Sequence, residues 1–352
     1  MKKSLVALAA LAATGAFAQS SVTLFGILDA TIAVGNGDTS NKTQLTNSGL
    51  NSSRLGFRGV EDLGGGLKAS FVIEGAVNND NGTGGTSNLN NQATGAGPAA
   101  AGSQGFTFNR QSIVSLLGSF GEIRLGRDYT PQFWSFSVYD PFGTNGVGTT
   151  QALNSSLTSA NGGGFTTIRA TNTIAYLSPT VGGFGVWVQT YFGENASNAA
   201  SQAGDGTGIR VAYDNGPLSL AAAFSKTTTG VGTNVTTTNF GASYDLPFAK
   251  LMAFYNTDSN TGLADLKSYD VGALVPAGPG TIRFAFSSAD NGTAKTDKWA
   301  IGYVYNFSKR TALYGTFASL SNSGGAAQSL NGAVTPANGA STGIDLGIRH
   351  VF

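Results

Sequence analysis

The chain is built from short segments in which apolar and polar side chains alternate. The last segment, residues 341–352, shows the pattern most clearly. One face carries Ile344, Leu346, Ile348, His350 and Phe352, and the other carries Asp345, Gly347, Arg349 and Val351. A period of two is the mark of a β-strand with two different surroundings. The charged face indicates water, and the apolar face indicates either the core of a soluble sandwich or the lipid around a membrane barrel.

Similar segments recur along the whole chain. In 297–307 one face is Trp299, Ile301, Tyr303, Tyr305 and Phe307, and the other includes Lys298, Ala300, Gly302 and Asn306. We predict sixteen strands, at 21–34, 52–61, 67–77, 106–117, 121–129, 169–178, 184–193, 207–214, 217–226, 235–245, 250–258, 266–275, 280–289, 297–307, 310–320 and 341–352.

The connections between these segments are tight at one end of the hairpins and long at the other. Turn residues such as Gly64-Gly65-Gly66 and Asn215-Gly216 make the tight ones. Outer-membrane barrels have short periplasmic turns and long external loops, whereas a soluble sandwich has no reason to separate them. We therefore predict an all-β fold, a sixteen-stranded antiparallel transmembrane β-barrel that is wide enough to hold an aqueous channel.

The beginning of the chain predicts export. A basic start, Met1-Lys2-Lys3, is followed by an apolar run, 5–13, and by Ala16-Phe17-Ala18, which fits a small-x-small cleavage site. We predict a signal peptide at 1–18 and a single barrel domain at 19–352. The apolar run is well short of the roughly 20 residues that a membrane-spanning helix needs.

Composition favours the barrel over a soluble domain. Charged residues make up 11% of the chain, against roughly 25% in soluble domains. Glycine accounts for 51 of 352 residues, and aromatic residues for 10%. Without the two leader lysines, 18 basic residues stand against 19 acidic ones, so we expect no nucleic-acid partner. The chain has no cysteine, and a closed ladder of backbone hydrogen bonds can replace disulfides.

The longest connection, 130–168, is predicted to narrow the channel. Its first part contains Phe133, Trp134, Tyr139 and Phe142, with Asp140 as its acid and no base. Aromatic rings gain by burial, so the loop should fold inward against the wall and carry Asp140 into the pore. A loop that binds a partner or contacts a second barrel is the alternative.

Arginines in the early strands are the candidate lining of the opposite wall. An arginine that faced lipid at the bilayer midplane would cost roughly 2–4 kcal/mol, so we expect these side chains to face the lumen. Headgroup contact at the membrane boundary is the alternative for any one of them. The predicted constriction consists of Arg54, Arg58, Arg110, Arg127 and Asp140, and further lining residues are Lys68, Arg124, Arg169 and Arg349. The odd spacing of Arg124 and Arg127 places one of the two near the rim or at an interface.

Several motifs together resemble the trimeric general porins of Gram-negative outer membranes, in the form typical of β-proteobacteria. They are SVTLFGILD at 21–29, SRLGFRGVEDLGGGLKA at 53–69, Arg110, FGEIRLGR at 120–127, RATNTI at 169–174 and GIRHVF at 347–352. The resemblance covers the whole mature chain. It implies a sixteen-stranded homotrimer in outer-membrane lipid and lipopolysaccharide, whose third loop folds inward.

The resemblance also implies roles for single residues. Arg54 and Arg110 match the wall arginines of a constriction, and Asp140 matches the acid that faces them from the loop. Phe352 matches the terminal aromatic residue that the barrel-assembly machinery reads. This chain has a single acid in its loop where many relatives have more, so we expect mild anion preference in a channel for passive diffusion of ions and small hydrophilic solutes.

Other functions receive less support from the residues. A channel with a dedicated solute site in the constriction is the main alternative, and an adhesin or phage receptor is a third hypothesis. An enzyme would need a histidine base or a carboxylate pair beside a nucleophile. The one histidine, His350, lies on the apolar face of the last strand. One histidine and no cysteine exclude most zinc sites, so we expect no catalysis, cofactor or metal.

Overall fold

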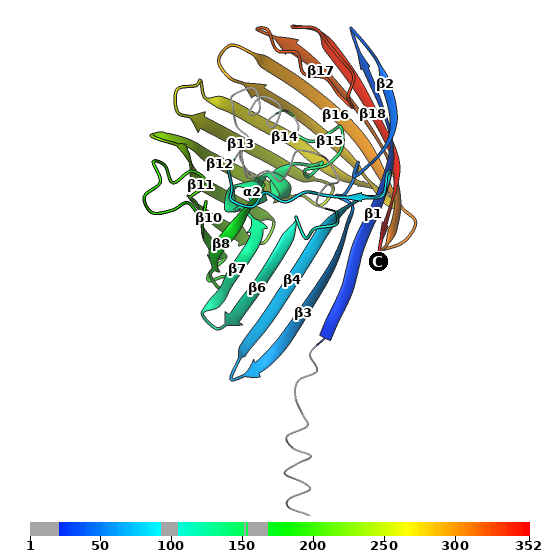
Figure 1. Ribbon diagram of the computed structural model, residues 1–352. Coiled ribbons are helices and arrows are strands. Elements are labelled where there is room, and N and C mark those ends of the chain that lie inside the picture. The colour runs from blue at the N-terminus through cyan, green and yellow to red at the C-terminus, as the bar shows by residue number, and fades with distance from the viewer. Residues whose placement is uncertain (1–20, 93–104, 151–152, 154–167) are drawn as a thin grey trace, which may run out of the picture.

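A computed structural model describes residues 21–92, 105–150, 153 and 168–352, and the predicted signal peptide lies outside the described residues. In this part of the chain a closed antiparallel β-barrel of 16 strands encloses a short helix (Figure 1). The predicted fold class, with its inward-folded third loop, is confirmed. No helix among these residues is long and apolar enough to cross a bilayer.

The barrel strands follow the predicted segments closely. They are β1 (Ser21–Gly37), β3 (Arg54–Gly64), β4 (Leu67–Asn78), β6 (Gln111–Gly118), β7 (Gly121–Tyr129), β8 (Arg169–Leu177), β9 (Phe184–Tyr191), β10 (Gly206–Asn215), β11 (Leu218–Gly230), β12 (Thr233–Asp245), β13 (Lys250–Asn260), β14 (Leu266–Ala277), β15 (Gly280–Asp290), β16 (Lys295–Asn306), β17 (Thr311–Ser323) and β18 (Ala340–Val351).

Two short strands and one helix were not predicted. The strand β2 (Lys42–Asn47) folds back on the second half of β1, and β5 (Thr83–Gly84) pairs with the end of β4. The helix α2 (Pro131–Tyr139) opens the third long loop, with Pro131 in its first turn. Proline suits this position because the first helical N–H groups have no partner inside the helix. All three elements lie in long connections, where strand periodicity gives no signal.

The barrel closes between its first and last strands. In β1, residues 27–37 pair with 341–351 of β18, while residues 21–27 pair with 54–60 of β3. Each strand thus has a neighbour on both sides, and no edge is left open.

Tight turns and long connections lie at opposite ends of the barrel, with one difference from prediction. Two-residue turns join β3 to β4 and β6 to β7, while the third long loop spans 130–168. At the long-loop end, β11 and β12 extend beyond the predicted segments and meet in a two-residue turn, Val231-Gly232. Gly232 has a φ of +67°, which suits glycine at such a turn.

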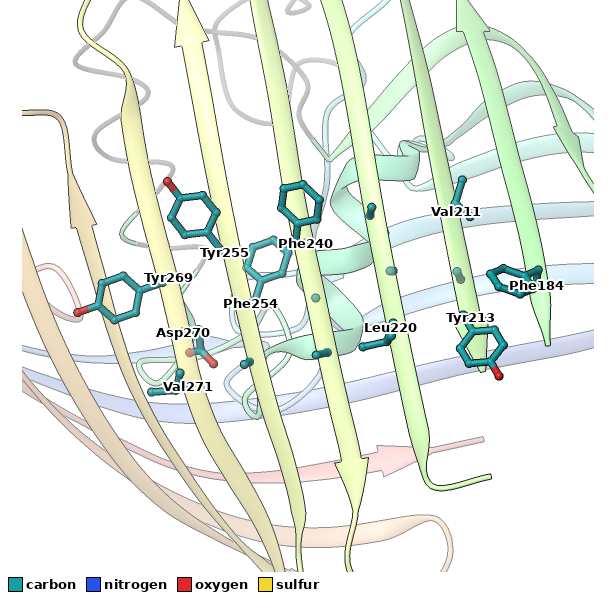
Figure 2. A pocket seen from close by; sticks show the side chains of 16 residues that line it. Phe184, Val211, Tyr213, Leu220, Phe240, Phe254, Tyr255, Tyr269, Asp270 and Val271 are labelled. Atoms are coloured by element: carbon teal, nitrogen blue, oxygen red, sulfur yellow. The ribbon is translucent and has the colours of Figure 1, made fainter. Parts of the chain in front are cut away.

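The two faces of each strand have the surroundings that alternation predicts. Leu346 and Ile348 are 54% and 47% exposed on the outer face of β18, while Asp345 beside them is buried. Figure 2 shows the same alternation on β13, where Tyr255 lies on the outer face and Phe254 points toward α2. The outer face therefore offers lipid an apolar belt, and the inner face carries polar and small side chains.

Candidate functional site: the lining of the channel

The helix α2 lies inside the barrel against one wall (Figure 1). Its buried rings, Phe133, Phe136 and Tyr139, pack in one apolar cluster with Ala212, Ala221 and Phe254 of β10, β11 and β13. A side chain at Gly241 of β12 would collide with the ring of Tyr139. The small residues of this wall thus admit the helix. The predicted burial holds for Phe133, Tyr139 and Phe142, whereas Trp134 is exposed.

The segment after α2 is anchored to the wall by polar contacts. Val147 N–H donates to Asp345 Oδ2 of β18 at 2.7 Å, and Thr150 Oγ1 donates to Asp270 Oδ2 of β14 at 2.5 Å. The buried Lys298 of β16 donates to the carbonyl oxygens of Val147 and Thr149. Three strands therefore hold one short segment, 147–150.

Asp140 belongs to this anchor. Its side chain is 4% exposed and accepts hydrogen bonds from Phe142 N–H at 2.7 Å, Thr150 N–H at 2.8 Å and Thr149 Oγ1 at 3.1 Å. Burial raises the pKa of the Asp140 carboxyl to about 6, and the nearby charge of Lys298 opposes that shift. The carboxyl group is thus enclosed between its own loop and the part of the barrel wall that carries Lys298.

Arginines gather on another part of the inner wall, on β3, on β8 and just before β6. They line a hollow of about 670 Å³ between this wall and α2, which we call the arginine hollow. Its charged residues are Arg54, Arg58, Arg110, Arg169 and Glu74. Four guanidinium groups therefore face the hollow with one carboxylate among them, and Asp140 does not line it.

Glu74 and Tyr129 hold three of these arginines. Arg110 Nε lies 2.5 Å from Glu74 Oε1, and Arg54 Nε lies 3.7 Å from Glu74 Oε2. Arg110 Nη2 donates to Tyr129 Oη at 2.7 Å, and Arg169 Nη2 donates to the same oxygen at 3.0 Å. Charge-assisted bonds of this kind fix the direction of a guanidinium group.

Arg58 has a different environment. It is exposed, and its guanidinium carbon lies 5.2 Å from the ring centre of Phe25. It shares the lumen face of β3 with Arg54, as the alternation of Leu55 and Phe57 predicts. A permanent positive charge is therefore presented to the water of the lumen.

Comparisons with known proteins agree with this architecture. Residues 4–325 match the family model described as Gram-negative porin. The chain belongs to the Gram-negative porin family. Outer membrane porin protein 32 of Delftia acidovorans is 39% identical over 371 residues, which cover 100% of both chains. An outer membrane porin protein of Bordetella pertussis is 28% identical, again over 100% of both chains.

Solved structures give the same result. The anion-selective porin from Comamonas acidovorans matches with a TM-score of 0.82 and 36% identity, over 95% of this chain and 100% of that chain. OmpT of Vibrio cholerae in its trimer form matches at a TM-score of 0.63 and 14% identity, over 95% and 99%, which shows the shared fold alone. The protein is therefore a multi-pass porin of a Gram-negative outer membrane, and it forms a channel for passive diffusion.

Two further predicted lining residues of the porin lie outside the arginine hollow. One lines a second hollow, and the other lies at the end of the channel where the tight turns are. Arg124 lines a hollow of about 480 Å³ toward the tight turns, paired with Glu122 at 2.7 Å and Asp128 at 3.0 Å. Lys68 is exposed beside the tight turn between β3 and β4. Both lie on lumen faces, and the charge of Arg124 is balanced by its acidic partners.

Arg127 lies elsewhere than the predicted constriction. The strand register shifts between Gly126 and Asp128, so the arginine turns toward the long connections. There it donates to Asn109 O and Thr171 Oγ1, each at 2.6 Å. It lines neither hollow described above, which fits the odd spacing of Arg124 and Arg127.

Three residues named in the sequence analysis, Arg349, His350 and Phe352, lie on or just after β18. Arg349 Nη1 donates to Asn51 Oδ1 at 3.2 Å on the lumen side. His350 is exposed, and its Nδ1 lies 2.9 Å from Thr311 Oγ1. Phe352 exchanges two 3.1 Å backbone hydrogen bonds with Gly26, and its ring lies over that glycine. The terminal residue therefore completes the seam between β18 and β1.

Sequence reasoning missed Glu74, Tyr129, Lys298 and the two wall aspartates. For Glu74 a signal existed, because the cost of a charge facing lipid applies to a carboxylate in the middle of a strand as it does to arginine. Lys298 was placed on the lumen face of its strand, yet nothing in the sequence indicates that the loop would cover it.

Proposed function

We propose that the channel favours anions, and that Arg54, Arg58, Arg110 and Arg169 provide the charge that selects them. The observation that carries this proposal is the hollow beside α2, which is lined by four guanidinium groups and one carboxylate. A fixed positive lining attracts anions and repels cations without energy coupling. The anion-selective porin from Comamonas acidovorans, 36% identical, is in keeping with it.

Within this proposal Asp140 acts through the loop. Its buried carboxyl group fixes the shape of the segment 140–150, which Lys298, Asp270 and Asp345 hold against the wall, and the docked loop keeps the passage narrow on the arginine side. The homotrimer, the lipopolysaccharide contacts and recognition of Phe352 by the assembly machinery remain predictions from the family resemblance.

The test is the reversal potential of the purified protein in a planar bilayer under a potassium chloride gradient. We expect a reversal potential with the sign that a channel more permeable to chloride than to potassium produces. The variant Arg54→Gln/Arg58→Gln/Arg169→Gln should lose most of this preference, because three of the four positive charges leave the hollow. Lys226→Gln, an exposed lysine of β11 outside the hollow, is the matched control and should leave the potential unchanged. A cation preference of the unmodified channel would contradict the proposal.

A further inference from the structure

The helix α2 exposes one side chain to the lumen. Trp134 is 40% exposed, whereas the other side chains of α2 are buried or half-buried. An indole left in water forgoes the free energy that burial of its ring would provide. Packing of the loop therefore does not explain why a tryptophan stands at this position.

Trp134 stands where the two hollows of the lumen meet. It lines the arginine hollow and also the second hollow, and both share Tyr129, Gln111 and Val72 in their walls. A solute that moves from one hollow to the other passes the indole. The arginine hollow has four basic residues and one acid, whereas the second has two basic residues, Arg124 and Arg210, and three acids. An anion that reaches Trp134 is therefore held on the arginine side.

Tyr129 provides a hydrogen-bond donor at the same junction. Its hydroxyl oxygen accepts from both Arg110 and Arg169. A guanidinium group can only donate, so the hydroxyl proton needs a different acceptor. None is found for it among the described residues. The Nε–H of Arg169 is buried and likewise has no partner there. A carboxylate in the hollow is an acceptor that suits the hydroxyl group, and the guanidinium group of Arg169 lines the same hollow.

The aromatic part of the junction is open to a flat partner. Trp134 meets Tyr129 at 5.7 Å and 61°, and Trp187 at 6.3 Å and 69°, so neither ring stacks flat on the indole. The guanidinium carbon of Arg169 lies 4.5 Å from the ring centre of Tyr129. The indole of Trp134 and the guanidinium group of Arg169 thus both contact the ring of Tyr129.

We propose that Trp134, Tyr129 and Arg169 form a binding site for small aromatic carboxylates on their way through the pore. The carboxylate accepts hydrogen bonds from Tyr129 and Arg169, and the ring of the solute packs on Trp134. This inference rests on the proposed anion preference and names the class of solute that gains most from it. An aromatic pair contributes about 0.5–1.5 kcal/mol beyond area burial, which corresponds to about a 2- to 10-fold gain in affinity.

Block of single-channel current tests the site, with benzoate and cyclohexanecarboxylate as probes of equal charge and similar size. We expect benzoate to block the unmodified channel at a concentration about 2- to 10-fold lower. In Trp134→Leu the two probes should become equal, and Trp134→Phe should restore part of the difference. Trp299→Leu, on the outer face of β16, is the control and should behave like the unmodified protein.

The outcomes separate this inference from the proposed function. Equal block by the two carboxylates in an anion-selective channel overturns the site and leaves the anion preference intact. Equal block by benzoate and benzyl alcohol, which lacks the carboxylate, also overturns it. A cation-selective channel contradicts both. If Trp134→Leu fails to assemble, the comparison of probes on the unmodified channel still decides.

Discussion

At the scale of residues, the charge of the arginine hollow depends on a single acid. Glu74 approaches Arg110 and Arg54 and is the one carboxylate in the wall of the arginine hollow. It neutralises part of the field and also orients Arg110, whose side chain is buried with it. A buried charge that loses its partner costs about 3–5 kcal/mol. Glu74 therefore lowers the positive charge of the hollow and at the same time stabilises the buried side chain of Arg110.

Glu74→Gln should therefore shift the reversal potential further to the anion side. The substitution removes the negative charge while the amide oxygen can still accept a hydrogen bond from Arg110. Some loss of stability should accompany the shift, within the cost given above for an unpaired buried charge. Asp265→Asn, in the exposed connection between β13 and β14, is the control and should change neither quantity. An unchanged potential in Glu74→Gln would show that this carboxylate is remote from the ion path.

At the scale of elements, the third loop is a separate body docked on the inner wall. It begins with α2, held by apolar packing, and the next part, 140–150, is held by Lys298, Asp270 and Asp345. Strand alternation predicted the wall because a period of two is a local property of the sequence. It could not predict the anchor, because the partners of Asp140 and Lys298 are set by the way the loop docks.

The segment 140–150 should become less protected against amide hydrogen exchange as the pH rises. The pKa of Asp140 is raised to about 6 in the folded protein, against about 3.9 in an unfolded chain. Its contribution to stability is fully present below about pH 4 and is lost as the pH rises through about 6. Amide hydrogen exchange in 140–150, corrected for intrinsic rates, should be slower at pH 5 than at pH 7.5.

The variant Asp140→Asn isolates this group from its titratable neighbours Lys298, Asp270, Asp345 and Arg283. Its exchange protection should change much less between the two pH values. If the unmodified protein and the variant show the same pH dependence, another member of the anchor is responsible.

At the scale of the whole molecule, the sequence predicted the number and order of the barrel strands. Each lipid-facing row repeats every second residue, so the belt is visible before any contact is known. Leu346 and Trp299 illustrate this on β18 and β16, where both are exposed on the outer face. The course of the long connections, including the fold-back of β2 on β1, depends on contacts between distant segments and was not predictable.

A charge on the belt should destabilise the barrel, whereas the same charge in the lumen should not. Leu220→Arg, on the outer face of β11 (Figure 2), should lower the free energy of unfolding from lipid vesicles by about 2–4 kcal/mol. Ser70→Arg, which faces the second hollow from β4, is the matched control and should cost much less. Equal losses in both variants would contradict the assignment of the two faces.

The seam between β1 and β18 has a consequence for folding kinetics. Ile27 pairs with Val351, so the strand that closes the barrel against β1 is synthesised more than 300 residues after it. Closing so long a loop costs chain entropy before the pairing is formed, and such distant contacts slow folding. Until Phe352 reaches Gly26, the chain has two unpaired strand edges and an apolar belt, which are prone to aggregation. Protection of the nascent chain on its way to the membrane is therefore a requirement of the topology itself.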